Sequence, residues 1–326
     1  KQSENCYRKV ISIDNSNFGA YNNLGNILKE SGNLEDSEIN FRRAIALHPN
    51  YSEAYNNLAN VLIDMKKFDD GEINLKHAIS LNPNLAEAYN SLGLISLIRK
   101  EKDNALKYFK KAIQLDPNLK VSKLFVKIIH GQRNTKNKNK NFKNIHKEEN
   151  FISGPIVLER KPDPKLINFL YDMNYRDMDN TPDTRFGNGK CSKDYNLFNE
   201  ENFIIKKLSS DMRNILEKTF KKEIYIYDSF FNIYSDGSGI TTHNHITKID
   251  NIENFNLSKN KYSLVYYLSV GDQQVNDPGI LKFYQPDEKI LPSDGMIVVF
   301  SANRNHSTVY NGKKDRIIVG INFYCL

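Results

Sequence analysis

A repeat of 34 residues constrains the fold of the first part of this chain more than any other feature. Residues 20–53, 54–87 and 88–121 align end to end, and each copy begins with AYN. In each copy apolar residues recur at helical spacing, and a proline ends the second of two predicted helices. Because one helix pair cannot bury its apolar face alone, the copies are expected to stack into an α-solenoid.

The length and pattern of the repeat resemble the tetratricopeptide (TPR) family. Tyr21, Leu24 and the small Gly25 lie on one face of the first predicted helix, as that family requires. We expect a TPR solenoid over residues 1–131, with a partial repeat before the three full copies and an amphipathic capping helix after them. The opening residues match the second helix of an earlier copy, so the chain is expected to begin inside a longer protein.

Asparagines recur on the predicted first helices, which line the concave groove of such a solenoid. They are Asn22, Asn23, Asn26, Asn56, Asn57, Asn60 and Asn90. An amide both donates and accepts, so asparagines stacked at the repeat period, such as Asn23 above Asn57, can hold a peptide backbone. The arrangement resembles the asparagine ladder of O-linked N-acetylglucosamine transferases, which implies a bound peptide or protein, although Ser91 departs from the ladder in the third copy. The alternative is that asparagine is common in this chain and the repeats copy it.

A basic segment follows the repeats. The formal net charge is +7, and much of the excess lies in residues 131–147, where Lys and Asn alternate with few apolar residues. This composition favours a solvated linker, residues 132–149, over a nucleic-acid-binding surface. The three cysteines are widely spaced, and no apolar run approaches the roughly 20 residues of a membrane span. We therefore expect a cytoplasmic protein without a membrane partner.

From residue 150 to residue 326 the pattern changes to short strands with a few helices. Helices are predicted over 163–174 and 200–222. Strands are predicted over 154–160, 224–234, 262–270, 279–286, 295–301 and 316–326. Many short strands separated by Gly, Asn, Asp and Pro predict a sandwich or barrel with the helices packed outside it.

Three histidines and one arginine stand out in this second domain. His243 and His245 are two residues apart in a predicted strand, residues 239–250, so both are expected to face the same side. With His306 from a distant strand they form a three-point site suited to a divalent transition metal that keeps open positions. Arg316 can hold a carboxylate through two parallel hydrogen bonds. Together these residues indicate a dicarboxylate or keto-acid co-substrate.

Residues 225–326, with their motifs THNH, YSLVYYLS, PGILKFY and RNHSTVYNGKKDR, resemble the catalytic core of the prolyl-hydroxylase type of iron(II)/2-oxoglutarate oxygenase. The resemblance implies a double-stranded β-helix, a jelly-roll or cupin-like barrel, with flanking helices. It implies that His243 and His306 bind Fe(II), that Arg316 pairs with the distal carboxylate of 2-oxoglutarate, and that O2 is the second co-substrate. Tyr234 and Tyr267 match tyrosines that line the 2-oxoglutarate pocket.

The first metal motif departs from that family, which has His-x-Asp or His-x-Glu where this chain has His243-Asn244-His245. Three hypotheses follow. In the first, His245 takes the place of the carboxylate and the site has three histidines. In the second, Asp250 folds back as the carboxylate, as in a cupin motif. In the third, the site has lost its metal.

The two resemblances together imply an Fe(II)- and 2-oxoglutarate-dependent hydroxylase whose TPR repeats recruit a peptide or protein. One alternative is a non-catalytic TPR scaffold with a degenerate barrel. Another is a cupin-like metalloenzyme that does not use 2-oxoglutarate. Residues 183–198 are predicted to form a long loop at the barrel mouth, in which Arg185 and Lys190 either contact substrate or are solvated. Nothing in the sequence specifies the substrate or the oligomeric state.

Overall fold

The computed structural model describes residues 2–138, 154–180, 184–252, 257–272 and 279–326. The chain divides into two compact units, Lys1–Lys143 and Asn144–Leu326, and each has its own hydrophobic core. Among the helices so described, none is long and apolar enough to cross a lipid bilayer.

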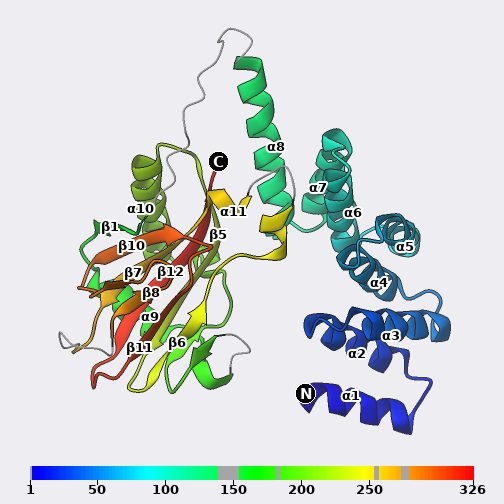
Figure 1. The fold of residues 1–326 in the computed structure, drawn as a ribbon, viewed down its shortest axis with the longest axis horizontal. Coiled ribbons are helices and arrows are strands. Elements are labelled where there is room, and N and C mark those ends of the chain that lie inside the picture. The colour runs from blue at the N-terminus through cyan, green and yellow to red at the C-terminus, as the bar shows by residue number, and fades with distance from the viewer. Residues whose placement is uncertain (1, 139–153, 181–183, 253–256, 273–278) are drawn as a thin grey trace. The chain divides into compact units, whose positions relative to one another are not determined.

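The first unit is built from α-helices joined by short turns (Figure 1). They are α1 (Gln2–Ile13), α2 (Phe18–Glu30), α3 (Leu34–Leu47), α4 (Ser52–Asp64), α5 (Phe68–Leu81), α6 (Ala86–Ile98), α7 (Lys102–Leu115) and α8 (Lys120–Lys138). The predicted helical solenoid is confirmed, with one helix pair for each copy of the repeat. The capping helix runs to Lys138 rather than ending at Gly131. The rest of the predicted linker lies outside the described residues.

Each helix pair closes around a matched small and large residue. A Cβ placed on Gly93 would lie 2.5 Å from the ring of Phe109, so only glycine fits there. The first copy has the same arrangement at Gly25. In the second copy the small residue is Ala59, and its neighbour in the core is the smaller Leu75 instead of phenylalanine. The volume of the pair is thus conserved, as close packing requires.

The second unit contains strands, helices and short 3-10 helices in alternation (Figure 1). The strands are β1 (Ile156–Glu159), β2 (Tyr175–Asp177), β3 (Arg185–Phe186), β4 (Lys190–Ser192), β5 (Ile224–Tyr234), β6 (Ser238–His243), β7 (Lys261–Ser269), β8 (Leu281–Phe283), β9 (Glu288–Ile290), β10 (Met296–Ser301), β11 (His306–Tyr310) and β12 (Arg316–Cys325). The helices are α9 (Pro164–Asp172), η2 (Met178–Asn180), η3 (Leu197–Asn199), α10 (Phe203–Phe220), η4 (Lys248–Asn251) and α11 (Leu257–Asn260).

The strands form two antiparallel sheets. One has the order β1-β10-β7-β12-β5-β4-β2, and the other has the order β3-β6-β11-β8-β9. Over the described ranges, strand pairing does not join the two sheets into a closed barrel. A sheet-rich second domain is therefore observed.

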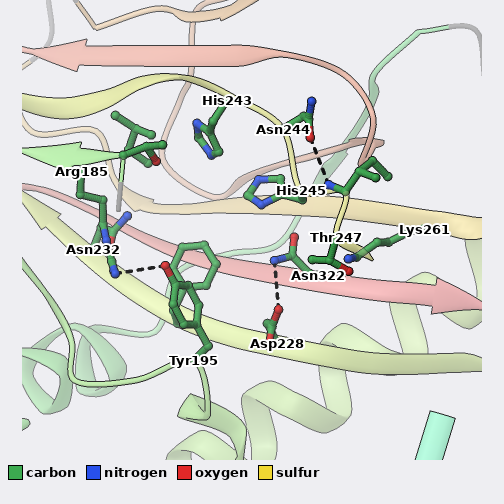
Figure 2. Close-up of a pocket in the computed structure, with 14 residues that line it drawn as sticks. Arg185, Tyr195, Asp228, Asn232, His243, Asn244, His245, Thr247, Lys261 and Asn322 are labelled. Atoms are coloured by element: carbon green, nitrogen blue, oxygen red, sulfur yellow. Dashed lines mark hydrogen bonds between the residues drawn. The ribbon is translucent and has the colours of Figure 1, made fainter. Parts of the chain in front are cut away.

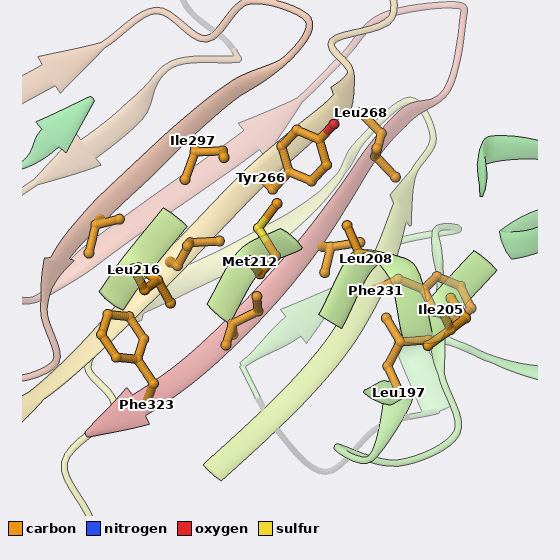
Figure 3. Close-up of a cluster of buried hydrophobic side chains, with 14 of the residues drawn as sticks. Leu197, Ile205, Leu208, Met212, Leu216, Phe231, Tyr266, Leu268, Ile297 and Phe323 are labelled. Atoms are coloured by element: carbon orange, nitrogen blue, oxygen red, sulfur yellow. The ribbon is translucent and has the colours of Figure 1, made fainter. Parts of the chain in front are cut away.

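Consecutive residues of the central strands point to opposite faces of the larger sheet, as strand geometry dictates. Tyr266 packs in a core with Met212 and Leu216 of α10, which covers that face (Figure 3). Its neighbour Tyr267 packs in a second core with Phe283 of the smaller sheet. The central strands are buried on both faces, which explains their nearly continuous apolar sequence.

Candidate functional site

The three predicted metal-binding histidines lie together at one end of the smaller sheet. β6 and β11 pair antiparallel with His243 directly opposite His306. His245 follows β6, and its backbone N–H donates to the carbonyl of Ala302 at 2.8 Å. One ligand atom from each of the three side chains lies within 4.8 Å of the others, slightly more than twice a metal–nitrogen bond of about 2.1 Å. One ion can contact all three after small ring movements.

The strand predicted over residues 239–250 ends at His243, so that prediction was wrong beyond this point. Asn244 turns the chain, because its side-chain oxygen accepts from the N–H of Ile246 at 3.1 Å. Its amide nitrogen donates to Asn305 at 3.0 Å. The turn, rather than strand alternation, brings His245 toward its neighbour.

Backbone carbonyls select the tautomer of two of the imidazoles. The Nδ1 of His243 contacts the carbonyl oxygen of Thr241 at 2.8 Å, and the Nδ1 of His306 contacts that of Arg304 at 3.2 Å. A carbonyl can only accept, so each Nδ1 carries the proton and the lone pair of each neutral ring is on Nε2, the atom that would bind a metal. In metal-binding histidines the ring nitrogen that does not bind the metal typically donates to a carbonyl or carboxylate in this way.

The environment keeps the imidazoles of His245 and His306 neutral, which a metal ligand must be. Burial, with a further contribution from His243, lowers the pKa of His306 to about 3. Burial and the two neighbouring imidazoles lower the pKa of His245 well below its usual value. Three neutral imidazoles suit iron, zinc and copper among the divalent ions, so this donor set fits an iron(II) centre.

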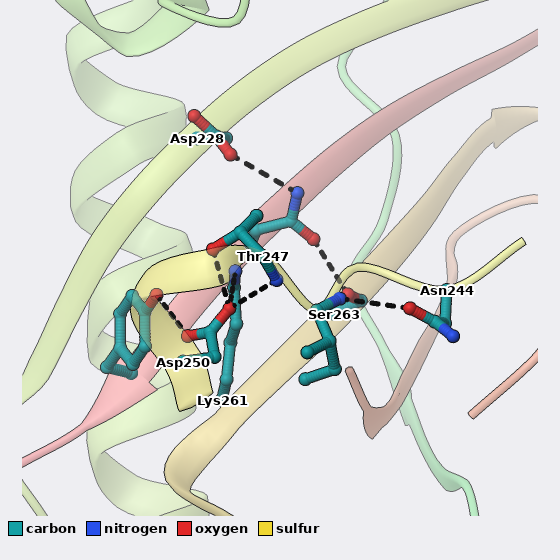
Figure 4. A network of polar contacts seen from close by, with 9 residues as sticks. Asp228, Asn244, Thr247, Asp250, Lys261 and Ser263 are labelled. Atoms are coloured by element: carbon teal, nitrogen blue, oxygen red, sulfur yellow. Dashed lines mark hydrogen bonds and ion pairs between the residues drawn. The ribbon is translucent and has the colours of Figure 1, made fainter. Parts of the chain in front are cut away.

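Asp250, the alternative third ligand, has a different role (Figure 4). One of its oxygens accepts from the ammonium of Lys261 at 2.8 Å and from both the backbone N–H and the hydroxyl of Thr247. The other accepts from the hydroxyl of Tyr324 at 2.7 Å. Asp250 caps η4 and is 2% exposed. Both oxygens are engaged away from the histidines, so the hypothesis that Asp250 is the metal ligand is not supported.

Arg316 begins β12 and is completely buried, at 0% exposure. One of its terminal nitrogens donates to the carbonyl of Gly279 at 2.7 Å. The Nε and the other terminal nitrogen have no hydrogen-bond partner among the residues that the structure describes. Burial lowers the pKa of this guanidinium.

A cavity lies in front of Arg316, and we call it the Arg316 cavity. Its volume, counted as the space open to the centre of a water molecule, is about 20 Å³, and its lining includes Tyr234, Tyr267, His306 and Thr308. The structure thus brings both predicted tyrosines, the predicted arginine and one predicted metal ligand to one space.

Two residues of this region were missed from the sequence. Thr308 is two residues beyond His306 on β11, so strand alternation already places it on the same face. Its buried hydroxyl has no partner among the described residues. The ring of Tyr310 lies 4.5 Å from the guanidinium carbon of Arg316, and that of Tyr267 lies 5.9 Å away.

A second space, which we call the Arg185 chamber, lies on the side of His243 and His245 (Figure 2). Its volume, counted as the space open to the centre of a water molecule, is about 280 Å³. Arg185, predicted to lie in a long loop, is instead on β3, opposite Ile240 of β6, and lines this chamber. Lys190, from the same predicted loop, is on β4 with its ammonium 4.2 Å from the ring centre of Tyr175.

In the repeats, several of the predicted asparagines bond to neighbouring helices. The amide of Asn57 donates to the oxygen of Asn22 at 3.0 Å, and the expected stacking of Asn23 above Asn57 stays a prediction. Asn23 is exposed. In the third copy, Ser91 donates to Asn60 at 2.8 Å.

Asn90 accepts in the same way from Ser122 of α8 at 2.8 Å. These bonds tie each first helix to the next. Asn26 is half-buried, whereas Asn56 is only 7% exposed and its side-chain oxygen has no partner in the described part of the chain. Peptide binding by these asparagines stays a prediction.

Comparison with known proteins identifies the repeats. Tetratricopeptide repeat family models match residues 6–39, 40–72 and 86–119. The chain therefore contains tetratricopeptide repeats, which commonly bind peptides or proteins. No curated protein matches the sequence.

Solved structures similar to this chain include MamA, at 23% identity and a TM-score of 0.37 over 41% of this chain and 79% of MamA. The pilF protein of Pseudomonas aeruginosa is 24% identical, with a TM-score of 0.37 over 40% of this chain and 59% of pilF. The first tetratricopeptide domain of Spaghetti (RPAP3), bound to an HSP90 peptide, is 19% identical, with a TM-score of 0.34 over 36% of this chain and 93% of that domain.

Proposed function

We propose that the second unit is an iron(II)- and 2-oxoglutarate-dependent oxygenase, a hydroxylase, and that the tetratricopeptide repeats recruit a peptide or protein to it. In this proposal the two sheets are the halves of a double-stranded β-helix, and His243, His245 and His306 hold the iron. The observation that carries the proposal is the buried guanidinium of Arg316, two of whose nitrogens have no partner within the described ranges and which adjoins a cavity that His306 also lines.

The energetics of Arg316 favour a carboxylate ligand. A buried charge without a partner costs several kcal/mol, and a carboxylate in the Arg316 cavity offsets this cost through paired hydrogen bonds. The hydroxyl of Thr308 offers one further donor to the same group. Since 2-oxoglutarate carries a carboxylate at one end and a keto acid at the other, the carboxylate would pair with Arg316 and the keto acid would point toward His306, which lines the same cavity.

Iron(II), 2-oxoglutarate and O2 together supply the oxidising power that hydroxylates a C–H bond, with succinate and carbon dioxide as products. The residues of this chain would bind and orient these groups. The three histidines would present nitrogen lone pairs to the iron, and Arg316 would orient the co-substrate. The apolar Leu281 and Ile318 in the cavity lining exclude water. A cytoplasmic location is proposed too, because all three cysteines are free thiols.

The proposal is tested by measuring succinate release after the chain has been loaded with iron(II) under nitrogen and then exposed to O2 with 2-oxoglutarate. The unmodified chain is expected to release succinate, and His243→Ala and Arg316→Ala are expected to reduce the rate by about a hundredfold or more. Arg316→Ala is expected to retain iron, whereas His243→Ala loses it. The control is Arg176→Ala, since Arg176 is exposed on β2.

The three-histidine donor set favours a second candidate, a cupin-like metalloenzyme that does not use 2-oxoglutarate. In that enzyme the unpartnered donors of Arg316 have no function. A chain that holds iron but neither binds 2-oxoglutarate nor releases succinate would support this candidate. A chain that binds no metal but retains a peptide partner would support the scaffold.

A further inference from the structure

We propose that Asn232 is a positioning residue for the co-substrate. It holds the hydroxyl of Tyr234 so that the phenol proton is donated to the same carboxylate that Arg316 binds. The inference rests on the proposed function, because that carboxylate is the distal end of 2-oxoglutarate.

Strand β5 brings Asn232 and Tyr234 to the cavity side of the larger sheet. They are alternate residues of β5, so their side chains share one face, whereas Phe231 and Ile233 pack in the core on the other face. The register of β5 with β12 puts Tyr234 directly opposite Arg316, and the Cβ atoms of such cross-strand neighbours are about 5 Å apart. Both residues line the Arg316 cavity, so both can contact one group bound there.

Arg185 determines which way round the amide of Asn232 lies. The guanidinium of Arg185 donates to the side-chain oxygen of Asn232 at 3.3 Å. Since a guanidinium can only donate, the oxygen end of the amide faces Arg185. The NH2 end then faces Tyr234 and donates to its hydroxyl oxygen at 3.0 Å. Asn232 is completely buried, so both ends of its amide need these partners.

The hydroxyl of Tyr234 is therefore left as a donor. Its oxygen accepts from Asn232, and the residues that the structure describes supply no acceptor for its proton. Burial raises the pKa of this phenol, so the proton is retained at neutral pH. A carboxylate in the cavity would accept this proton in a hydrogen bond, and a bond to a charged acceptor is stronger than one to a neutral acceptor.

Two further residues that line the same cavity also carry buried polar atoms that can donate. Over the described ranges, the hydroxyl of Thr308 and two nitrogens of Arg316 have no partner. The two oxygens of a carboxylate offer about four lone pairs, enough for several donors at once. Asn232 completes this set, because without its donation Tyr234 could act as an acceptor instead.

Asn232→Asp tests the inference, since it reverses one hydrogen bond with almost no change of shape. A carboxylate at this position still accepts from Arg185, but it cannot donate, so the proton of Tyr234 turns toward it. In calorimetric titrations of the iron(II)-loaded full chain under nitrogen, this variant is expected to bind 2-oxoglutarate at least about tenfold more weakly. Asn199→Asp, which adds the same charge at an exposed position, is expected to leave the affinity unchanged.

Tyr234→Phe separates the lost hydrogen bond from the added charge. Alone it is expected to weaken binding of 2-oxoglutarate by about tenfold. In the Tyr234→Phe background, Asn232→Asp is expected to cause less than about threefold further loss, because no phenol proton remains to be turned away. A further loss as large as in the unmodified background would show that the charge alone acts, and would overturn the inference.

The kinetic constants distinguish positioning from a merely structural role. In Asn232→Asp the KM for 2-oxoglutarate is expected to rise at least about tenfold, while kcat for succinate release changes by less than about threefold. Iron content and circular dichroism melts check the metal site and the fold. A fall in kcat with unchanged KM would contradict the proposed role.

If Asn232→Asp does not fold, the unmodified chain still tests the contact. Zinc replaces iron, and tyrosine is labelled with 13C at the carbon that bears the hydroxyl. The Tyr234 signal, identified by its absence from Tyr234→Phe, is expected to move when 2-oxoglutarate binds. An unmoved signal would overturn the inference.

The outcomes separate this inference from the proposed function. If the unmodified chain binds 2-oxoglutarate and releases succinate, and Asn232→Asp binds it equally well, this inference is wrong and the proposed function stands. If the unmodified chain does not bind 2-oxoglutarate, both are wrong.

Discussion

Two buried cations of the second unit, Lys261 and Arg316, differ in what surrounds them. Lys261, 1% exposed, donates to the carboxylate of Asp250, which also accepts from Tyr324. Arg316, 0% exposed, donates to one backbone carbonyl, and two of its nitrogens have no partner in the described residues. A buried charge normally keeps a partner. The contrast supports the proposal that Lys261 stabilises the fold, whereas Arg316 binds a ligand.

The largest expected effect is the loss of stability when the ion pair between Lys261 and Asp250 is broken. Lys261→Met leaves Asp250 buried with its charge unmatched and is expected to lower the free energy of unfolding by about 3–5 kcal/mol. Urea denaturation measures this, with exposed Lys259→Met as the control. Adding Asp250→Leu removes the stranded charge and is expected to restore much of the loss. A single-variant loss below about 1 kcal/mol would contradict the structural role of the pair.

Arg316→Met is expected to have the opposite pattern. Turnover of 2-oxoglutarate falls by at least about a hundredfold, which corresponds to about 2.7 kcal/mol of transition-state stabilisation. The free energy of unfolding stays the same or rises, because an unmatched buried charge is replaced by an apolar side chain of similar length. If urea denaturation shows a loss as large as that of Lys261→Met, the two cations do not differ as described.

Stabilisation by bound 2-oxoglutarate is expected to depend on Arg316. Bound 2-oxoglutarate at a hundred times its dissociation constant is expected to add about 2.7 kcal/mol to the stability of the iron-loaded chain under nitrogen. The increase is absent in Arg316→Met and retained in Lys259→Met. Thermal melts with and without ligand measure it. An equal increase in Arg316→Met would show that the ligand binds elsewhere.

A smaller effect concerns His306, a titratable group that burial keeps neutral. Its pKa is about 3 in the folded chain, against about 6.5 when unfolded, so the unfolded chain binds the proton first as the pH falls. Stability from this group is complete above pH 6.5 and declines below it, by about 2 kcal/mol at pH 5. Urea denaturation of the metal-free chain at pH 7.5 and pH 5 tests this, and His306→Gln is expected to weaken the dependence.

The repeats were predictable because one pattern recurs. The 34-residue period repeats the same packing positions three times. The sequence itself shows that Gly25 is replaced by Ala59 in the second copy and that the large residue packed against this position becomes Leu75. The bonding partner of Asn57 was not predictable, because the 34-residue period does not specify which side-chain atoms of neighbouring helices come within hydrogen-bond distance.

In the second unit, the long buried strands were predictable and the short ones were not. The prediction of a strand over 224–234 has the bounds of β5, because apolar residues fill both of its faces. β3 and β9, of two and three residues, are too short to show a period. The role of Asp250 was not predictable, because its partners Lys261 and Tyr324 come within hydrogen-bond distance only in the folded chain.

The most direct test of the central claim is a calorimetric titration of 2-oxoglutarate into the iron(II)-loaded chain and its Arg316→Met variant under nitrogen. The account predicts one binding site per chain in the unmodified protein and a loss of affinity of at least about a hundredfold in the variant. Iron content, measured in both samples, is expected to be equal. Equal affinity for 2-oxoglutarate in the two proteins, or no binding to either, would contradict the claim that Arg316 is kept for this ligand.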